Sequence, residues 1–119
     1  MKTTVAIPEV IERELLSWPG VTARTHRFGG REFRIGNREI GHLHGGQVAD
    51  LPFSRAVRDE LVARGEVAAH HHLPDSGWVS FYLGGEADLP GVLALFRRNY
   101  ERLQALGAHE HRSPADRQI

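Results

Sequence analysis

The sequence predicts a single α+β domain, in which one antiparallel sheet has about three helices packed mainly on one of its faces. Two observations carry this prediction. Amphipathic segments with helix-capping residues occur near both ends of the chain and in its middle, and short segments of strand-forming residues, separated by turn residues, lie between them. A chain of 119 residues also suits one domain with one core.

Three segments combine the helical spacing of apolar residues with signals for a helix end. The first helix is predicted over Pro8 to Ser17, because proline is favoured in the first turn. The second is predicted over Ser54 to Arg64, with Ser54 as its N-cap and Gly65 just after its end. The third is predicted over Asp88 to Leu106, with Asp88 as its N-cap.

Strand-forming residues fill the stretches between these helices. Arg31 to Ile35 is followed by Gly36-Asn37, a dipeptide typical of a two-residue hairpin turn, so the chain is expected to run back as a second strand. The other predicted strands are Thr22 to Phe28, Gln47 to Phe53, Val67 to Leu73 and Trp78 to Leu83.

The hairpin turn also predicts which side chains share a face of the sheet. If Gly36 and Asn37 form the turn, Phe33 lies opposite Ile40, because cross-strand partners in a hairpin point to the same side. One face would then hold Phe33, Ile35, Ile40, His42 and His44, and the other Glu32, Arg34, Glu39 and Leu43. This register predicts that the two histidines lie on the apolar side.

The predicted domain covers residues 1–107. Residues 108–119 are polar and show no apolar periodicity, so we expect them to form a disordered tail. The sequence shows neither an internal repeat nor a second domain.

Charge and composition narrow the classes of function. Fifteen basic residues balance fifteen acidic ones, so no field of one sign is expected to attract a nucleic acid. The absence of cysteine excludes a disulfide framework, a thiolate zinc site and a cysteine nucleophile. Apolar runs are too short to span a bilayer and the N-terminus lacks the apolar core of a signal peptide, so we expect a cytoplasmic protein without a membrane partner.

The distinctive feature of the sequence is a set of five histidines on two predicted strands. His42 and His44 alternate on one strand, so their side chains point to one face, about 7 Å apart. His70, His71 and His72 occupy a later strand. The sequence leaves open whether His71, or His70 together with His72, faces the first pair.

A structural role competes with a functional one at these histidines. A single strand histidine is more often satisfied by a backbone carbonyl or a carboxylate than by a ligand. Five of them on two short strands exceed what a core normally holds, which favours a functional site with His42, His44, His70 and His72 as catalytic candidates. A metal is not expected, because no acidic residue stands at a convincing ligand spacing and a His-x-His pair is a weak signal.

Apolar and aromatic side chains are the candidates for contact with a small molecule. Trp78 and Tyr82 share one face of a strand, a pattern that fits stacking on an aromatic ligand and fits a buried strand equally well. The predicted substrate-binding residues are Phe33, Ile40, His71, Trp78 and Tyr82.

Three stretches of the chain resemble the small bacterial luciferase-family domain. They are Phe28 to Phe33, Ile40 to Gly45 and His70 to Phe81, and the combination of GHxHG with HHxLPDSGWVSF is fairly specific. The resemblance runs from about His26 to Tyr100. The same domain is similar to the core of fungal bioluminescence luciferase.

The resemblance implies an enzyme that adds molecular oxygen to a hydroxylated pyrone without a metal, a flavin or another cofactor. It implies that His42 or His44 takes a proton from the substrate and that another strand histidine stabilises the resulting anion. Trp78 and Tyr82 would line the ring site. We therefore expect a small-molecule site, with a cofactor-independent oxygenase of hydroxylated aromatics as its specific form. A non-catalytic binding or interaction module and a histidine-ligated metal protein are the alternatives.

Overall fold

The computed structural model describes residues 6–26, 29–70, 73 and 75–110 of the chain. The elements follow one another as α1 (Ile7–Leu16), β1 (Val21–Thr25), β2 (Arg31–Ile35), β3 (Arg38–His44), β4 (Val48–Pro52), α2 (Arg55–Ala63), β5 (Ala68–Ala69), β6 (Trp78–Tyr82), the 3-10 helix η1 (Glu86–Asp88) and α3 (Leu89–Glu110). The predicted fold class, an antiparallel sheet with three α-helices packed against it, is confirmed.

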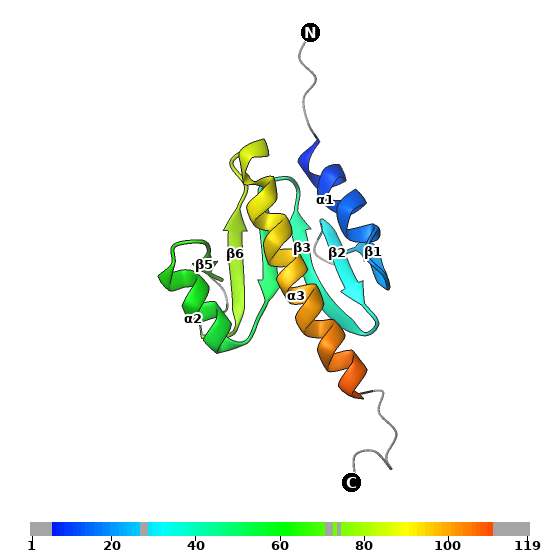
Figure 1. The fold of residues 1–119 in the computed structure, drawn as a ribbon. Coiled ribbons are helices and arrows are strands. Elements are labelled where there is room, and N and C mark those ends of the chain that lie inside the picture. The colour runs from blue at the N-terminus through cyan, green and yellow to red at the C-terminus, as the bar shows by residue number, and fades with distance from the viewer. Residues whose placement is uncertain (1–5, 27–28, 71–72, 74, 111–119) are drawn as a thin grey trace.

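The strands form one sheet in the order β1-β2-β3-β4-β6-β5, and every neighbouring pair is antiparallel. Helix α3 crosses one face of this sheet, and α1 lies on the same side and packs against α3 and β1 (Figure 1). Helix α2 packs against β5 and β6 and is tied to α3 by an ion pair between Glu60 and Arg98 (2.7 Å).

Local sequence signals set the ends of the first two helices as predicted. Pro8 lies in the first turn of α1. Ser54 caps α2, because its side-chain oxygen accepts the backbone N–H of Val57 (3.2 Å). After α2, Gly65 has a φ of 77°, and its N–H donates back to the carbonyl of Val62 (3.0 Å).

The third helix begins directly after Asp88, as predicted, but it ends later than predicted. Helix α3 begins at Leu89, and the Asp88 carboxylate accepts the N–H of Gly84 (2.7 Å). At its other end α3 runs to Glu110, beyond the predicted end at Leu106. Gly107 continues the helix because one glycine costs only about 1 kcal/mol relative to alanine. Residues 111–119 lie outside the described part of the chain.

The strands agree with the prediction except near residue 70. The hairpin between β2 and β3 turns at Gly36-Asn37, where only Gly36 has a positive φ, 58°. Strand β5 covers Ala68–Ala69 alone, although Val67 to Leu73 was predicted, and β1, β4 and β6 are slightly shorter than expected. Strand β5 lies at the edge of the sheet and pairs with β6 only. A longer β5 would therefore gain backbone hydrogen bonds on one side alone.

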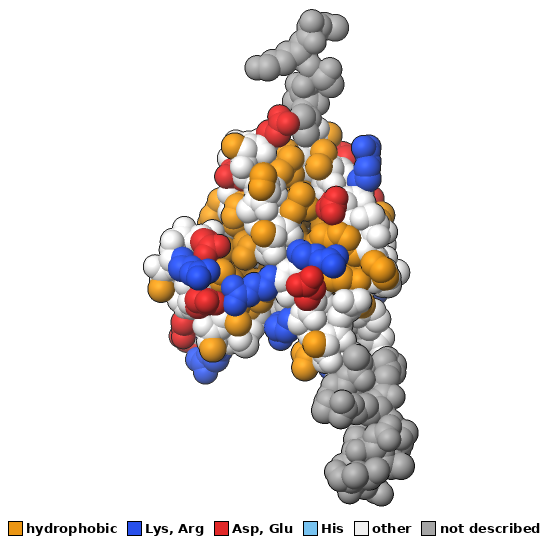
Figure 2. Space-filling model, in the orientation of Figure 1, with side chains coloured by type: hydrophobic (Ala, Val, Ile, Leu, Met, Phe, Trp, Pro, Cys, Tyr) orange, Lys and Arg blue, Asp and Glu red, His pale blue; other side chains and the backbone are white. Residues whose placement is uncertain are grey.

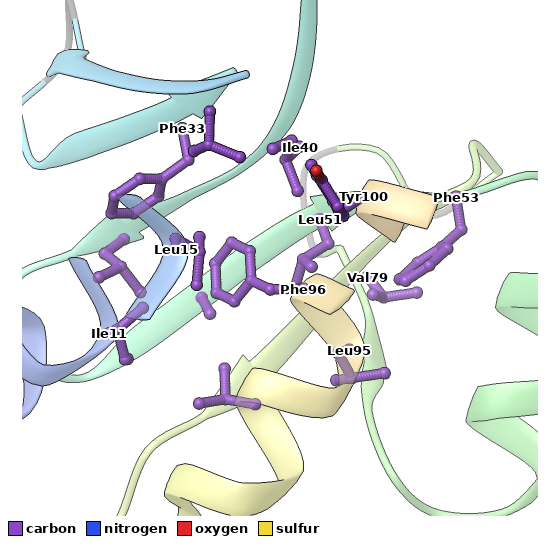
Figure 3. Packing of buried hydrophobic residues seen from close by; sticks show 14 of the residues in the cluster. Ile11, Leu15, Phe33, Ile40, Leu51, Phe53, Val79, Leu95, Phe96 and Tyr100 are labelled. Atoms are coloured by element: carbon purple, nitrogen blue, oxygen red, sulfur yellow. The ribbon is translucent and has the colours of Figure 1, made fainter. Parts of the chain in front are cut away.

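The hydrophobic core fills the space between α3 and the sheet. Phe33, Ile40 and Phe96 are fully buried there, and the rings of Phe33 and Phe96 meet edge to face with centroids 5.8 Å apart (Figure 3). On the helix-covered face of the molecule, basic and acidic side chains are interspersed with apolar ones (Figure 2). No helix of the described residues is long and apolar enough to cross a membrane.

A β-bulge in β3 decides which face each later residue of that strand occupies. The first two pairs after the hairpin turn are as predicted, but Phe33 then pairs with Gly41 rather than with Ile40. Ile40 is the extra residue of the bulge, and Ile40 and Gly41 both pack on the α3 side. His42 and His44 therefore lie on the opposite face, and the prediction that they share the side of Phe33 was wrong.

Helix α3 binds the bulge directly. The side-chain amide of Asn99, which is fully buried, donates to the backbone carbonyl of Ile40 (2.7 Å). Arg102 then donates to the Asn99 side-chain oxygen (2.9 Å) and to the carbonyl of Pro52 (2.7 Å). A carbonyl displaced from the regular ladder thus keeps a partner, as a buried backbone group requires.

Gly41 should not tolerate a side chain. A Cβ atom there would lie 2.8 Å from Cε1 of Phe96, 2.9 Å from the Asp50 carbonyl oxygen and 3.0 Å from Cγ of Leu51. We expect Gly41→Ala to lower the free energy of unfolding, measured with urea, by about 1–3 kcal/mol because the site is overpacked. The matched control is Gly107→Ala, whose Cβ would meet nothing within 4 Å and which should leave stability equal or raise it by up to about 1 kcal/mol. Equal stability of the Gly41→Ala variant and the wild type would contradict the close approach of α3.

Candidate functional site

The polar face, by which we mean the sheet face opposite α3, carries a row of paired polar side chains. The strand register places His42 of β3 beside Asp50 of β4, and Asp50 beside Ser80 of β6. Asp50 and Ser80 are both buried, and the Ser80 hydroxyl donates to Oδ1 of Asp50 (2.6 Å). Because a buried carboxylate is costly unless it is paired, this hydrogen bond is part of what allows Asp50 to lie inside the protein.

The second oxygen of Asp50 lies among three imidazoles. Oδ2 is 2.9 Å from Nε2 of His44, 3.4 Å from Nε2 of His42 and 3.4 Å from Nε2 of His70. The Nε2 atoms of His42 and His44 are 3.1 Å apart. We call these four residues the histidine–aspartate cluster. The His44 side chain is 43% exposed, against 9% for His42 and 13% for His70, so His44 is the member that solvent reaches.

Glu39 holds the other ring nitrogen of His42. Its Oε2 lies 2.5 Å from Nδ1 of His42. The bulge makes this contact possible, because side chains alternate along a regular strand and residues 39 and 42 would otherwise point to opposite faces. The ring of His42 is therefore fixed at both nitrogens, by Glu39 at Nδ1 and by the cluster at Nε2.

Two further rings flank His42. His26, which follows β1, stacks on His42 with centroids 4.3 Å apart and an interplanar angle of 29°. The Trp78 ring of β6 lies 5.5 Å from His42 and 6.2 Å from His70, measured between centroids. Sequence analysis did not single out His26, because β1 is two strands away from β3 and only the sheet order brings the two rings together.

Glu32 borders the site but belongs to an arginine network. Its Oε2 accepts hydrogen bonds from Nη1 of Arg34 (2.5 Å) and from Nε of Arg24 (3.2 Å). Burial acts to raise the pKa of Glu32, but Arg34 and Arg24 outweigh burial and lower it. Its other oxygen is 3.9 Å from Nε2 of His26, so Glu32 supports the edge of the site as an anion.

Charges within the site shift the pKa values of its members. Burial acts to lower the pKa of His42, but the interactions with Asp50 and Glu39 outweigh burial and raise the pKa to about 9. Burial acts to raise the pKa of Asp50, but the interaction with His42 and further contacts lower it to about 2. For His26, burial and the neighbouring charge of His42 lower the pKa. Asp50 is therefore an anion at neutral pH.

The structure brings three of the four candidate catalytic residues together, since His42, His44 and His70 all surround Asp50. His71 and His72 lie outside the described residues. Asp50 itself was missed by sequence analysis. A carboxylate within the apolar strand β4 was the available signal, because aspartate is rarely buried without a partner.

The candidate substrate-binding residues fall in different places. Trp78 lies at the cluster. Tyr82 is on the same face of β6, four residues further along, and is 59% exposed. Phe33 and Ile40 are fully buried in the core on the α3 side, so the sheet separates them from the histidines. Their expected position beside His42 depended on the register that the bulge changes.

The arrangement can support two kinds of chemistry. Imidazoles and carboxylates can exchange protons with a bound molecule, and they can also hold a cation. Within the described part of the chain, two groups of three residues place one possible ligand atom each within 4.8 Å of the others: His42, His44 and Asp50, and His26, Glu39 and His42. From the sequence, no acidic residue stands at a ligand spacing from the histidines. The structure nevertheless places two acidic residues beside them, because Asp50 comes from the neighbouring strand and Glu39 from across the bulge.

The comparison with known protein families covers most of this site. The family model of the Luciferase domain matches residues 37–99, more than half of the chain. This chain belongs to the Luciferase domain family. The matched segment of the Luciferase domain includes Glu39 and all four residues of the histidine–aspartate cluster, whereas His26 and Glu32 precede it. No curated protein and no solved structure matches the chain.

Removal of the Ser80 hydroxyl tests how strongly the Luciferase domain depends on the buried carboxylate. Ser80→Ala deletes a buried hydrogen bond to Asp50, so we expect the free energy of unfolding to fall by about 1.5–3 kcal/mol. The control is Ser17→Ala, which deletes an exposed hydrogen bond to the carbonyl of Glu14 (2.6 Å) and should cost less than about 1 kcal/mol. Urea unfolding of the two variants measures the difference, and equal losses would contradict the burial of the Ser80–Asp50 pair.

Proposed function

We propose that this Luciferase-domain chain is an oxidoreductase of the oxygenase class, which uses molecular oxygen to oxidise a small hydroxylated aromatic or pyrone at the polar face of its sheet. The observation that carries the proposal is the histidine–aspartate cluster with the Trp78 ring beside it. Membership of the family, together with the resemblance to the core of fungal bioluminescence luciferase, supports a substrate of this class.

Oxidation of such a ring by oxygen needs polar groups and an aromatic surface in one place. The ring hydroxyl has to lose its proton before the ring is electron-rich enough to react, and the negative charge that then develops on oxygen has to be stabilised. The cluster offers three imidazole nitrogens within 3.4 Å of one carboxylate oxygen. These groups can accept the proton and donate hydrogen bonds to the anion.

His44 and Trp78 provide the approach to the cluster. Since His44 is the most exposed member, its ring is the first group that a molecule from solvent meets. The Trp78 indole is partly buried and lies next to His42 and His70, so a flat ring stacked on it would hold its hydroxyl group beside the cluster.

Loss of the exposed imidazole should abolish turnover without unfolding the protein. In an oxygen-electrode assay with a hydroxylated pyrone and, in parallel, a catechol, we expect His44→Ala to lower kcat/KM by at least about 100-fold, the usual contribution of a group that moves a proton. The same change should alter the free energy of unfolding by less than about 1 kcal/mol, because the pair of His44 with Asp50 is open to solvent on the His44 side.

The matched control is His109→Ala, which removes an imidazole from the last turn of α3 and should keep full turnover. If wild type and His44→Ala oxidise the rings at the same rate, or if neither ring is oxidised, the oxygenase proposal is wrong. A loss of several degrees in the melting temperature of His44→Ala, with unchanged turnover, would assign the histidines a structural role instead.

A further inference from the structure

We infer that His42, His44 and Asp50 bind a divalent transition-metal ion through Nε2, Nε2 and Oδ2. The inference rests on the proposed function in one respect, since it concerns the same cluster and names its cofactor class.

The spacing of the three ligand atoms fits a shared ion. The two Nε2 atoms are 3.1 Å apart, and Oδ2 of Asp50 is 2.9 Å from His44 and 3.4 Å from His42. If each bond to the ion is about 2.1 Å long, neighbouring ligands are about 3.4 Å apart in a tetrahedral site and about 3.0 Å apart in an octahedral one. The observed separations cover this interval.

Three imidazole nitrogens lie close to one oxygen of Asp50. A carboxylate oxygen has two lone pairs, yet the Nε2 atoms of His42, His44 and His70 all lie within 3.4 Å of it. The Nε2 atoms of His42 and His44 are also only 3.1 Å apart, so two N–H groups fit here only if both hydrogens are turned toward Oδ2. An ion at this place would accept one lone pair from each ligand.

The groups behind the ligands are those that orient metal-binding side chains. The His42 ring contacts the Glu39 carboxylate at Nδ1, which leaves Nε2 for the ion. Asp50 receives the Ser80 hydroxyl on Oδ1, which leaves Oδ2 for the ion. Both supports act on the atom opposite the proposed ligand atom, so the two ligands are held in position before any ion binds.

The ligand set also points to the class of ion and to its use. Two imidazoles and one carboxylate suit first-row divalent ions such as Fe²⁺, Co²⁺ and Zn²⁺, and three protein ligands leave positions for water or substrate. When bound, such an ion would supply Lewis-acid chemistry to a substrate oxygen, and His70, the imidazole of the cluster that is not among its three ligands, would take the proton of the ring hydroxyl in the proposed reaction. His44, as the exposed ligand, lies on the side from which a substrate oxygen would approach.

The test is titration of protein made without a polyhistidine tag, and freed of metal, with Zn²⁺ alone and with Co²⁺ alone. Calorimetry should give one ion per chain, and the Co²⁺ protein should show the absorption bands of a nitrogen- and oxygen-ligated ion. His44→Ala and Asp50→Asn should each weaken binding by more than Glu39→Gln, for which a loss of roughly 10–100-fold is expected of a group that orients a ligand. His109→Ala should bind as the wild type does.

Several outcomes would overturn the inference. One is binding of less than one ion per chain, and another is binding that His44→Ala leaves unchanged, which would place the ion elsewhere. If Glu39→Gln abolishes binding while Asp50→Asn does not, the ion belongs to the His26, Glu39 and His42 group instead. Should Asp50→Asn fail to fold, His44→Ala still decides the question, because His44 is partly exposed.

The metal inference and the proposed function can fail separately. Stoichiometric binding that His44→Ala removes, in a protein that oxidises neither ring, supports the metal site and contradicts the oxygenase proposal. Turnover that persists after chelation, in protein shown by elemental analysis to be metal-free, supports the oxygenase proposal and overturns the ion as its cofactor.

Discussion

The β-bulge in β3 is the constraint on which both faces of the sheet depend. On the core side it turns Ile40 and Gly41 toward α3, where the absent side chain of Gly41 leaves room for Phe96 and the amide of Asn99 binds the Ile40 carbonyl. On the polar side the same extra residue brings Glu39 onto the face of the site histidines. Helix packing and the charged site are therefore fixed by one backbone irregularity, and moving the bulge by one residue would disturb both.

Most of the fold follows from signals that act over a few residues. The hairpin turn at Gly36-Asn37, the Ser54 cap and the positive φ of Gly65 are each decided within one turn of chain, and the sequence predicted all three positions. The bulge is different, because it is held by a hydrogen bond between residues 59 positions apart, which hydrophobic periodicity does not report. Gly41 was the local sign, since a glycine inside a strand often marks a bulge.

In the site, too, the local features could be predicted from the sequence and the contacts between distant residues could not. Alternation along β3 correctly placed His42 and His44 on one face, because that rule needs only neighbouring residues. Which face it was depended on the bulge, and the carboxylate partner depended on the pairing of β3 with β4, where Asp50 stands opposite His42. His26, directly after β1, stacks on His42 from two strands away, a contact that alternation within one strand does not report. The residue types thus pointed to a histidine site, whereas the register of the sheet determines which residues belong to it.

The energetic cost of the cluster supports the proposal that it serves binding rather than folding. Burying Asp50 and His42 removes them from water, and ion pairs at best offset that loss, so apolar residues of similar size would stabilise a sheet equally well or better. The fold has no need of polar groups here, since α3 completes the hydrophobic core on the other face. If the network served only stability, we would expect all of its polar groups to be buried and paired with one another. Here the network ends in the imidazole of His44, which is open to solvent. Polar groups that cost stability, and that reach the surface at one defined point, are what the proposed substrate and ion sites require.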